Sequence, residues 1–430
     1  MVNNVKRLTF NVKRKKVTRQ KMKLYLLLLP LFLFFFGKNL SAQAPSDSIS
    51  KINLLFVGDI MGHDPQIESA EITKNESYNY EPCFQYVKPI IEKADLAIAN
   101  LEVTLPGKPP YRGYPNFRSP NELALALRLA GFDLLVTANN HSNDAGKKGV
   151  INTISTVKDY GFYQTGTFKN QEDRDLHYPL IVYKNDFKIA FLNYTYGTNG
   201  IKTRPPVIVN YIDEKLIEAD LKLAHELKPD AIIVITHWGK EYKYIENEKQ
   251  RKLAKKIFNW GADLIIGMHP HVVQPIREMK ILQQDSTFKK TLVTYSLGNF
   301  ISGQTTPNTE GGFMFEVTLE KDKKTNKVTL GEHHYIPVWR YVYQDSKKKS
   351  TYFALPISPF ENGNGAWIGM DEENKKSLQA FAKKTRGHLK DSHSSERIIS
   401  LKELGDVPKL ELVKKGIKKT KSTKKVKVQK

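Results

Sequence analysis

The stretch GADLIIGMHPHVVQP, residues 261–275, joins an uninterrupted apolar run to two closely spaced histidines. A short continuous apolar run is typical of a strand that is covered on both faces, as in the interior of an α/β protein. His269 and His271 are two positions apart, and at this spacing side chains of an extended chain point to the same side. The stretch therefore predicts a buried strand whose carboxyl end presents two imidazoles together.

The same organisation recurs along the chain. Six further apolar runs are predicted as strands, at 52–59, 94–102, 132–141, 187–195, 230–239 and 291–300. Longer segments between them, such as PNELALALRLAG (120–131) and NEKQRKLAKKIFNWG (247–261), have helical spacing and end in glycine, a common helix stop. Alternating strands and helices predict an α/β fold built from crossover units.

The basic charge of the chain is concentrated at its two ends. The formal net charge of +22 would ordinarily indicate nucleic acid or an anionic surface as a partner. Residues 1–23 and 414–430 each carry nine Lys or Arg and no acidic residue, which leaves about +4 for the rest of the chain. We therefore expect no nucleic-acid partner. Residues 408–430 are predicted to be a disordered lysine-rich tail, with contact to anionic lipid or an acidic polymer as the alternative.

The N-terminal segment has the pattern of an export signal. A basic flank precedes the apolar run Leu24–Phe36, and small residues follow it. The run is shorter than the roughly 20 residues of a membrane span. Residues 1–44 are therefore predicted to be a basic leader and signal peptide, cleaved after Ala42 or Ala44, and the protein is expected in the periplasm or cell envelope. A retained membrane anchor is the alternative, and Met22 is an alternative start.

Four further segments complete the predicted organisation. Residues 45–51 form a polar linker, 52–357 the main domain and 358–407 a C-terminal extension before the tail at 408–430. A hairpin-like pair of strands around a polar turn is predicted within 320–337, near the end of the main domain. Cys83 is the only cysteine, so no intrachain disulfide can form and stability must come from a packed core.

Polar side chains collect where the predicted strands end, which is where functional groups of open α/β sheets converge. They are Asp59, Asn100, Glu102, Asn139, Asn140, His141, His237, His269 and His271. Taken singly, such an aspartate is often a helix cap and such a histidine a hydrogen-bonded structural residue. Together they form a mixed oxygen and nitrogen donor set without thiolate, which suits Mn²⁺, Zn²⁺ or Fe. The set predicts a site for one or two divalent metal ions.

Six motifs, in this order and spacing, resemble the signatures of a known family. They are GDIM (58–61), ANLEVTL (99–105), FRSPNELALALRLAGFDLLVTANNHSNDAGKKG (117–149), THWGKEY (236–242), GADLIIGMHPHVVQP (261–275) and YSLGNFI (295–301). The family is CapA, the poly-γ-glutamate capsule synthesis proteins, which is related to the calcineurin-like metallophosphoesterases. The resemblance covers about 52–357. It implies a four-layer α/β/β/α sandwich of the metallophosphoesterase type, with two mixed sheets and a metal site at the strand ends.

The resemblance also implies a role for each site residue. The implied ligands of a first ion are Asp59 and His271, those of a second ion are Asn140, His237 and His269, and Glu102 stands where the phosphoesterases have a bridging aspartate. His141 would be the proton donor. With two ions, a bridging water would become the nucleophile, and His141 would protonate the leaving oxygen.

The chain departs from the phosphoesterase pattern at two points. Met61 stands where those enzymes have a histidine, and Asn100 and Glu102 stand where they have a Gly-Asp pair. The first metal site therefore has fewer ligands. His63 is a further candidate ligand for it, and a site with a single ion is the alternative.

Three functions fit these features. The first is an exported metal-dependent hydrolase that acts on a phosphoester or a related bond in envelope or capsular polymer material. The second is a non-catalytic accessory subunit that holds or guides an anionic polymer such as poly-γ-glutamate at the membrane, with membrane-associated capsule machinery as its partner. In the third, the Asn, His and Asp side chains bind a sugar or peptide without metal.

Overall fold

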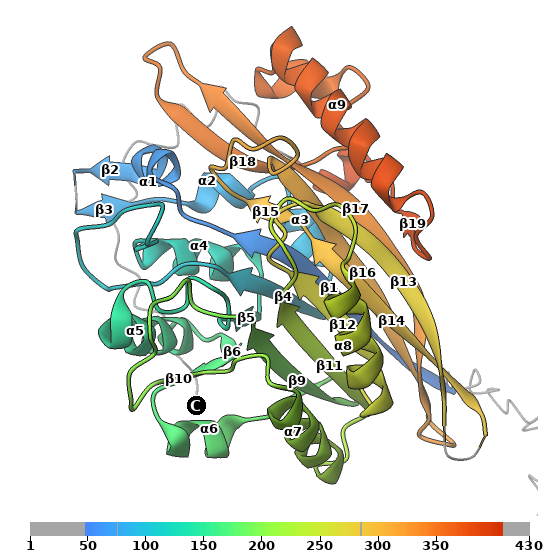
Figure 1. The fold of residues 1–430 in the computed structure, drawn as a ribbon. Coiled ribbons are helices and arrows are strands. Elements are labelled where there is room, and N and C mark those ends of the chain that lie inside the picture. Colours follow the sequence, from blue (N-terminus) through green and yellow to red (C-terminus); the bar gives the residue numbers. More distant parts are fainter. Residues whose placement is uncertain (1–47, 75, 284–285, 407–430) are drawn as a thin grey trace, which may run out of the picture. The chain divides into compact units, whose positions relative to one another are not determined.

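Each apolar run predicted as a strand contributes a strand to one of two large β-sheets in the computed structural model, which describes residues 48–74, 76–283 and 286–406 (Figure 1). The run 132–141 does so only over Leu134–Val136, and the chain turns after it. The larger sheet runs in the order β18 (Ser350–Pro356), β17 (Val328–Gln344), β16 (Gly311–Asp322), β1 (Ile49–Ile60), β4 (Leu96–Leu101), β5 (Leu134–Val136) and β6 (Tyr163–Thr165), with β15 (Asn299–Ile301) beside β1 and β19 (Ser395–Glu396) beside β17. The smaller sheet runs β13 (Val273–Leu282), β14 (Phe288–Leu297), β12 (Leu264–Met268), β11 (Ala231–His237), β9 (Phe187–Thr195) and β8 (Leu180–Lys184). Both sheets contain parallel and antiparallel neighbours.

Two short antiparallel pairs and the helices complete the described part of the chain. The pairs are β2 (Glu71–Thr73) with β3 (Ser77–Tyr78), and β7 (Thr167–Phe168) with β10 (Ile208–Val209). The helices are α1 (Asp64–Ala70), α2 (Glu81–Phe84), α3 (Lys88–Ile91), α4 (Glu122–Ala130), α5 (Gly146–Asp159), α6 (Gln171–His177), α7 (Glu214–Glu226), α8 (Glu248–Asn259) and α9 (Glu372–Leu389), with 3-10 turns at Asn364–Ile368 and Leu401–Leu404.

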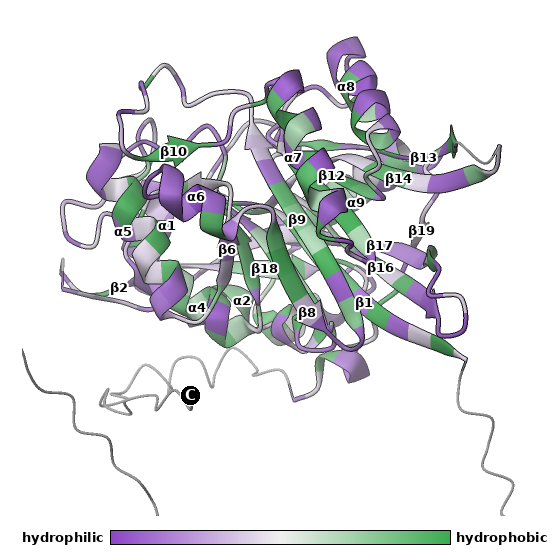
Figure 2. Ribbon diagram, turned by 90° about the horizontal axis from the view of Figure 1, so that it is seen from below, coloured by the Kyte–Doolittle hydropathy of each residue, from purple (hydrophilic) through white to green (hydrophobic). Residues whose placement is uncertain are grey.

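The side chains of β1 show why the apolar runs are continuous. Ile52, Leu54 and Phe56 enter the core between the two sheets, where they meet residues of the second sheet such as Ile233 and Leu264. The intervening positions of β1 face the other way, into a core shared with α2, α3 and α4. Each central strand is therefore buried on both faces, and the polar surface is carried by helices and loops (Figure 2).

The second sheet is covered in the same way on its outer face. A third apolar cluster joins residues of β9, β11 and β14 to those of α7 and α8, for example Val234 with Ile257. The layers are thus helix, sheet, sheet and helix. The expected four-layer α/β/β/α sandwich with two mixed sheets is confirmed.

The region after residue 310 extends the larger sheet. The predicted hairpin is confirmed, since β16 and β17 pair antiparallel around a turn at 323–327. Helix α9 then packs against β13 and β17. The predicted leader 1–44, residues 45–47 of the predicted linker and the tail 408–430 lie outside the described residues. Residues 49–51, which were predicted as linker, belong to β1. Among the residues that the structure describes, no helix combines the length and apolar character needed to cross a bilayer.

Candidate metal centre

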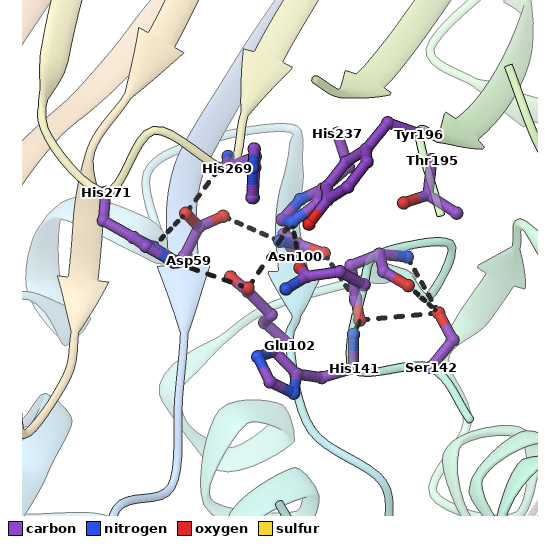
Figure 3. A network of polar contacts seen from close by, with 12 residues as sticks. Asp59, Asn100, Glu102, His141, Ser142, Thr195, Tyr196, His237, His269 and His271 are labelled. Carbon is purple, nitrogen blue, oxygen red and sulfur yellow. Dashed lines mark hydrogen bonds and ion pairs between the residues drawn. The ribbon is translucent and has the colours of Figure 1, made fainter. Parts of the chain in front are cut away.

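The carboxyl ends of strands from both sheets meet at one place, and the predicted site residues lie there (Figure 3). Asp59 is near the end of β1, and Glu102 directly follows β4, its neighbour in the larger sheet. Asn140 and His141 lie in the turn after β5. The histidines come from the other sheet: His237 ends β11, while His269 and His271 follow β12. All seven predicted residues are buried.

The two histidines of the HPH segment converge for a different reason from the one expected. We predicted that strand alternation would point both imidazoles to one side, but β12 ends at Met268 and the segment turns. His269 has a φ of 99° and His271 a φ of 58°. Positive φ is unfavourable for a residue with a side chain, at about 1–3 kcal/mol each when the region is sparsely populated. Such strain is typical of functional sites, and here it aims two rings at the centre.

Glu102 has an unusual environment for a carboxylate. Its exposed fraction is 0%, and neither carboxylate oxygen has a hydrogen-bond partner. Oε1 lies 3.4 Å from His237 Nε2 and 3.8 Å from His271 Nε2. Burial and the nearby carboxylate of Asp59 raise the pKa of Glu102 well above its usual range. An ionised carboxylate here requires a cation, because burying an unpaired charge is strongly unfavourable.

Asp59, in contrast, is well supplied with polar contacts. Its Oδ1 accepts a hydrogen bond of 2.7 Å from Asn100 Nδ2, and its Oδ2 lies 3.1 Å from His271 Nδ1 and 3.3 Å from the backbone nitrogen of His269. Burial alone would raise its pKa, but the contacts with His271, the nearby His237 and Asn100 together hold the pKa below its usual range. Asp59 is therefore the ionised partner of the two acids.

The imidazoles are held in the form that binds metals. Burial lowers the pKa of His237 to about 3, and burial also lowers the pKa of His269 well below its usual range. Neutral imidazole is the metal ligand, so both rings are available as donors. Nε2 of His237 lies 2.6 Å from Asn140 Oδ1, which brings the predicted amide ligand into the same cluster. Nδ1 of His269 is buried without a hydrogen-bond partner.

The donor atoms fall into two groups that could each hold a metal ion. One group is Glu102, His269 and His271, and the other is Asp59, Glu102 and His237, with the donor atoms of each group within 4.8 Å of one another. Glu102 belongs to both groups, as expected for a bridging ligand. The grouping places His269 with His271, whereas the resemblance assigned them to different ions. Which ion each residue binds stays a prediction.

His141 lies beside this cluster without belonging to either group. Its Nδ1 is 2.7 Å from Asp144 Oδ2, and its Nε2 is 3.4 Å from Asn199 Nδ2. Phe117 contacts the ring edge-on, with centroids 4.6 Å apart, and its backbone nitrogen donates to Asp144 Oδ2 at 2.6 Å. The ring is therefore oriented by the carboxylate of Asp144 through Nδ1, while Nε2 has the longer contact with Asn199.

His63 is not brought into the cluster as a ligand. It precedes α1, where its Nδ1 accepts a hydrogen bond of 3.1 Å from the backbone nitrogen of Gly303 and its ring contacts Phe117. Burial lowers its pKa to about 4. Among the described residues, neither candidate metal group includes His63. Its expected role in filling the first site is not supported by this geometry.

Several residues that complete the site were not selected from the sequence. Asp144 orients His141, and Asn299 Oδ1 lies 3.1 Å from His271 Nδ1. Tyr196 covers His269, with ring centroids 4.4 Å apart, and Asn199 accepts a hydrogen bond of 3.2 Å from Asn140 Nδ2. Asp144 shortly follows the predicted strand 132–141 and Asn299 lies at the end of the predicted strand 291–300, and these positions were the available signals. Tyr196 and Asn199 carried no comparable signal.

The fold and the site define the chain as an α/β/β/α sandwich protein. Its buried cluster of carboxylates and imidazoles lies where the strand ends of the two sheets meet. The chain belongs to the family of the bacterial capsule synthesis protein PGA_cap, whose sequence model matches residues 53–304. The resemblance to CapA proteins is therefore confirmed.

Two curated relatives carry the CapA name. The chain is 26% identical over 343 residues to the PGA biosynthesis protein CapA of Bacillus subtilis (strain 168). The alignment covers 74% of this chain and 83% of that protein. The chain is 31% identical over 268 residues to the capsule biosynthesis protein CapA of Bacillus anthracis. This alignment covers 59% of this chain and 60% of that protein.

Solved structures that align with the chain include phosphatases and phosphoesterases. The calcineurin-like phosphoesterase YfkN from Bacillus subtilis aligns with 80% of this chain and 100% of that chain, at 13% identity and a TM-score of 0.40. A phosphatase from Mycoplasma pneumoniae aligns with 67% of this chain and 94% of that chain, at 16% identity and a TM-score of 0.37.

Proposed function

We propose that this chain is an exported, metal-dependent hydrolase that cleaves a phosphoester or a related bond in cell-envelope or capsular polymer material. The observation that carries the proposal is the carboxylate of Glu102, which is fully buried, has no hydrogen-bond partner and is shared by both groups of donor atoms. A buried charge without a partner lowers the stability of the fold, so a structural role does not explain Glu102. The arrangement favours a role for Glu102 in binding a cation.

The residues present fit a divalent ion such as Mn²⁺, Zn²⁺ or Fe. The donors are carboxylate oxygens and neutral imidazole nitrogens, with the amide oxygen of Asn140 beside them and no thiolate in the cluster. Asp59, Glu102, His237, His269 and His271 would hold one or two ions. Bound there, an ion would polarise a phosphoryl oxygen and lower the pKa of a water molecule.

The remaining chemistry falls to residues beside the ligands. His141 would donate the proton that a departing alkoxide needs, from the ring nitrogen that faces away from Asp144. Asp144 would hold the ring in one orientation through the 2.7 Å contact. Tyr196 would limit the access of water to His269, against which it packs.

The second candidate is an accessory protein that binds an anionic polymer without cleaving it. The names of the two CapA relatives, which refer to biosynthesis, favour this role. An anionic envelope polymer such as poly-γ-glutamate would be the partner in this role, whereas the hydrolase would act on a phosphoester substrate.

Metal analysis and a panel of phosphomonoesters and phosphodiesters test the proposal. We expect the purified protein to retain about one or two divalent ions per chain and to hydrolyse at least one ester with Mn²⁺ or Zn²⁺. Metal retention without hydrolysis of any ester would favour the accessory role. A protein that binds no divalent ion tightly would rule out the hydrolase.

A further inference from the structure

We propose that three tyrosines beside the candidate metal centre form a subsite for the pyranose ring of a sugar phosphoester. They are Tyr114, in the segment between β4 and α4, Tyr196, directly after β9, and Tyr242, in the segment between β11 and α8. We call these three residues the tyrosine rim. The subsite depends on the proposed function in one respect, because the phosphate of the same ligand would be held at the centre.

The three rim residues leave much of their surface open to solvent. Tyr114, Tyr196 and Tyr242 are 73%, 46% and 37% exposed. Among the described residues, the other exposed tyrosines are Tyr163 and Tyr183. Most of the exposed tyrosines therefore gather at the candidate metal centre. Exposed aromatic side chains beside a cluster of polar groups are typical of a ligand site.

Tyr196 is fixed beside the histidines of the smaller sheet. Its backbone nitrogen donates to the His237 carbonyl at 3.0 Å. Its ring packs against His269, with ring centroids 4.4 Å apart, and lies beside His237 (Figure 3). Its hydroxyl donates to Asn199 Oδ1 at 3.3 Å. The ring is thus held in place from the side of the centre, while nearly half of the residue stays open to a ligand.

Tyr242 is fixed to the HPH segment itself. Its backbone nitrogen donates to the Pro270 carbonyl at 2.8 Å, and its ring centroid is 6.2 Å from that of His271. Burial, the carboxylate of Glu241 and the phenol of Tyr114 raise the pKa of Tyr242 to about 12. Glu241 and Tyr114 therefore both lie near Tyr242.

Tyr114 lies in a short loop that is anchored beside His141. Arg112 and Arg118 close the loop with two backbone hydrogen bonds, of 3.0 Å and 2.9 Å. The Tyr114 ring centroid is 6.5 Å from that of Phe117, and Phe117 in turn contacts the ring of His141 edge-on. The tyrosine rim therefore extends from the predicted proton donor to the predicted metal ligands.

Polar groups beside the tyrosines favour a ring that carries hydroxyls. Glu241 is exposed, and after burial its carboxylate is the largest cause of the raised pKa of both Tyr196 and Tyr242, so it lies near both. Asn199 is exposed as well and is in contact with the Tyr196 hydroxyl. A pyranose offers C–H groups on its faces to the aromatic rings, and it offers hydroxyls at its edge to a carboxylate and an amide.

The same polar groups disfavour two other occupants. A polymer of carboxylates would meet the like charge of Glu241, which is unfavourable. A nucleobase would stack on the tyrosines, but it lacks the several hydroxyls that suit Glu241 and Asn199 together. A sugar ring joined to the phosphate satisfies both the aromatic and the polar part of the rim.

Calorimetric titration with non-cleavable phosphonates tests the proposal without relying on hydrolysis. In these analogues a methylene group replaces the bridging oxygen of the ester, and the full chain is titrated in the presence of Mn²⁺. We expect the analogue of glucose 1-phosphate to bind at least about tenfold more tightly than the analogue of glycerol 3-phosphate. Both carry the same charged group, and only the first has a ring for the tyrosines to contact.

Substitutions in the rim test which residues supply this preference. Tyr114→Ala and Tyr242→Ala should each weaken binding of the glucose analogue about three- to tenfold and leave binding of the glycerol analogue unchanged. Tyr114→Phe keeps the ring and should keep the preference. Tyr183→Ala is the matched control and should change neither affinity. Tyr183 is 68% exposed and pairs with Lys188 near the start of β9, whereas Tyr196 follows the end of that strand.

Four results would overturn the proposal. They are no binding of either analogue, equal affinity for both, tighter binding of the corresponding analogue of adenosine monophosphate, and a preference for the glucose analogue that persists in both alanine variants. Failure of the proposed hydrolase gives a different result. Tight binding of the glucose analogue without cleavage of glucose 1-phosphate would support the subsite and contradict the hydrolase, whereas cleavage of phosphoesters without preference for a sugar ring would do the reverse.

Discussion

Glu102 Oε1 lies 3.4 Å from His237 Nε2, although Glu102 follows a strand of the larger sheet and His237 ends a strand of the smaller one. The contact joins the two halves of the sandwich at the edge where their parallel strands end. Neither oxygen of Glu102 has a hydrogen-bond partner, so the contact is incomplete without a cation. The consequences for metal binding and stability can be measured.

Replacing Glu102 with Gln should remove metal binding without unfolding the protein. The variant loses the carboxylate shared by both donor groups, so metal content measured by elemental analysis should fall to less than about one tenth. The metal-free variant should melt at the same temperature as the metal-free wild type or higher, because a buried unpaired carboxylate is removed. Added Mn²⁺ should raise the melting temperature of the wild type alone.

Glu241→Gln is the matched control for this variant. Glu241 is exposed, and its charge contributes to the raised pKa of Glu102, so the substitution changes the local charge equally without removing a ligand. Its metal content should match that of the wild type. If Glu102→Gln retained its metal, the bridging role assigned to Glu102 would be wrong.

His141→Ala should separate proton donation from metal binding. His141 is outside both donor groups, so metal content should stay nearly intact while turnover slows by about 10² to 10⁴. Esters with leaving groups that need no proton, such as nitrophenolates, should be affected less. Asp144→Asn should slow turnover by a smaller factor, because the ring of His141 is retained but loses its orienting charge. Loss of metal in His141→Ala would identify His141 as a ligand.

Replacing His269 and His271 together with Ala should strip the metal, because each supplies a ring nitrogen to the centre. The readout is metal content beside a melting curve. A purely structural role for these residues predicts a lower melting temperature and unchanged metal content. His225→Ala is a suitable control, since His225 lies on α7 and contacts the backbone carbonyl of Trp260, away from the centre.

Cys83 should be unreactive in the native protein. Burial raises the pKa of its thiol to about 12, and only 7% of the residue is exposed. At pH 8 the thiolate is then about one part in ten thousand, so a disulfide reagent should modify Cys83 only after the protein unfolds. In guanidinium chloride the same reagent should report one thiol per chain. Rapid modification without denaturant would show that the core around α2 opens.

Export should remove the N-terminal segment, which lies outside the described residues. N-terminal sequencing of the protein from the envelope fraction should begin near Gln43 or Pro45, because the apolar run is short and is followed by small residues. An intact Met22 in the mature protein would instead indicate a membrane anchor.

Much of the architecture could be predicted because its signals are local. The run ADLIIG predicted a strand that is buried on both faces, and β12 is such a strand. The segment around Ala124 predicted a helix ending at Gly131, and α4 ends there with Gly131 at a φ of 106°. Polar residues at strand ends predicted which side chains meet, because parallel strands end at a common edge.

Other features of the site could not be predicted, because they depend on how segments distant in sequence pack. The residue His63 is close to Asp59 in sequence, yet its ring turns toward Phe117 and Gly303. Strand alternation suggested the convergence of His269 and His271, but the turn at positive φ produces it. No sequence pattern shows which buried acid keeps its hydrogen bonds and which loses them.

The sequence by itself determined the central strands of both sheets, the family and the set of polar residues at the strand ends. Apolar runs, helix stops and ordered motifs are properties of adjacent residues. The tertiary structure alone decided that β4 and β11, in different sheets, bring Glu102 to His237. It also decided that Asp59 receives the hydrogen bonds that Glu102 lacks. These relationships depend on the packing of one sheet against the other, and that packing is determined by the whole buried core rather than by any single segment.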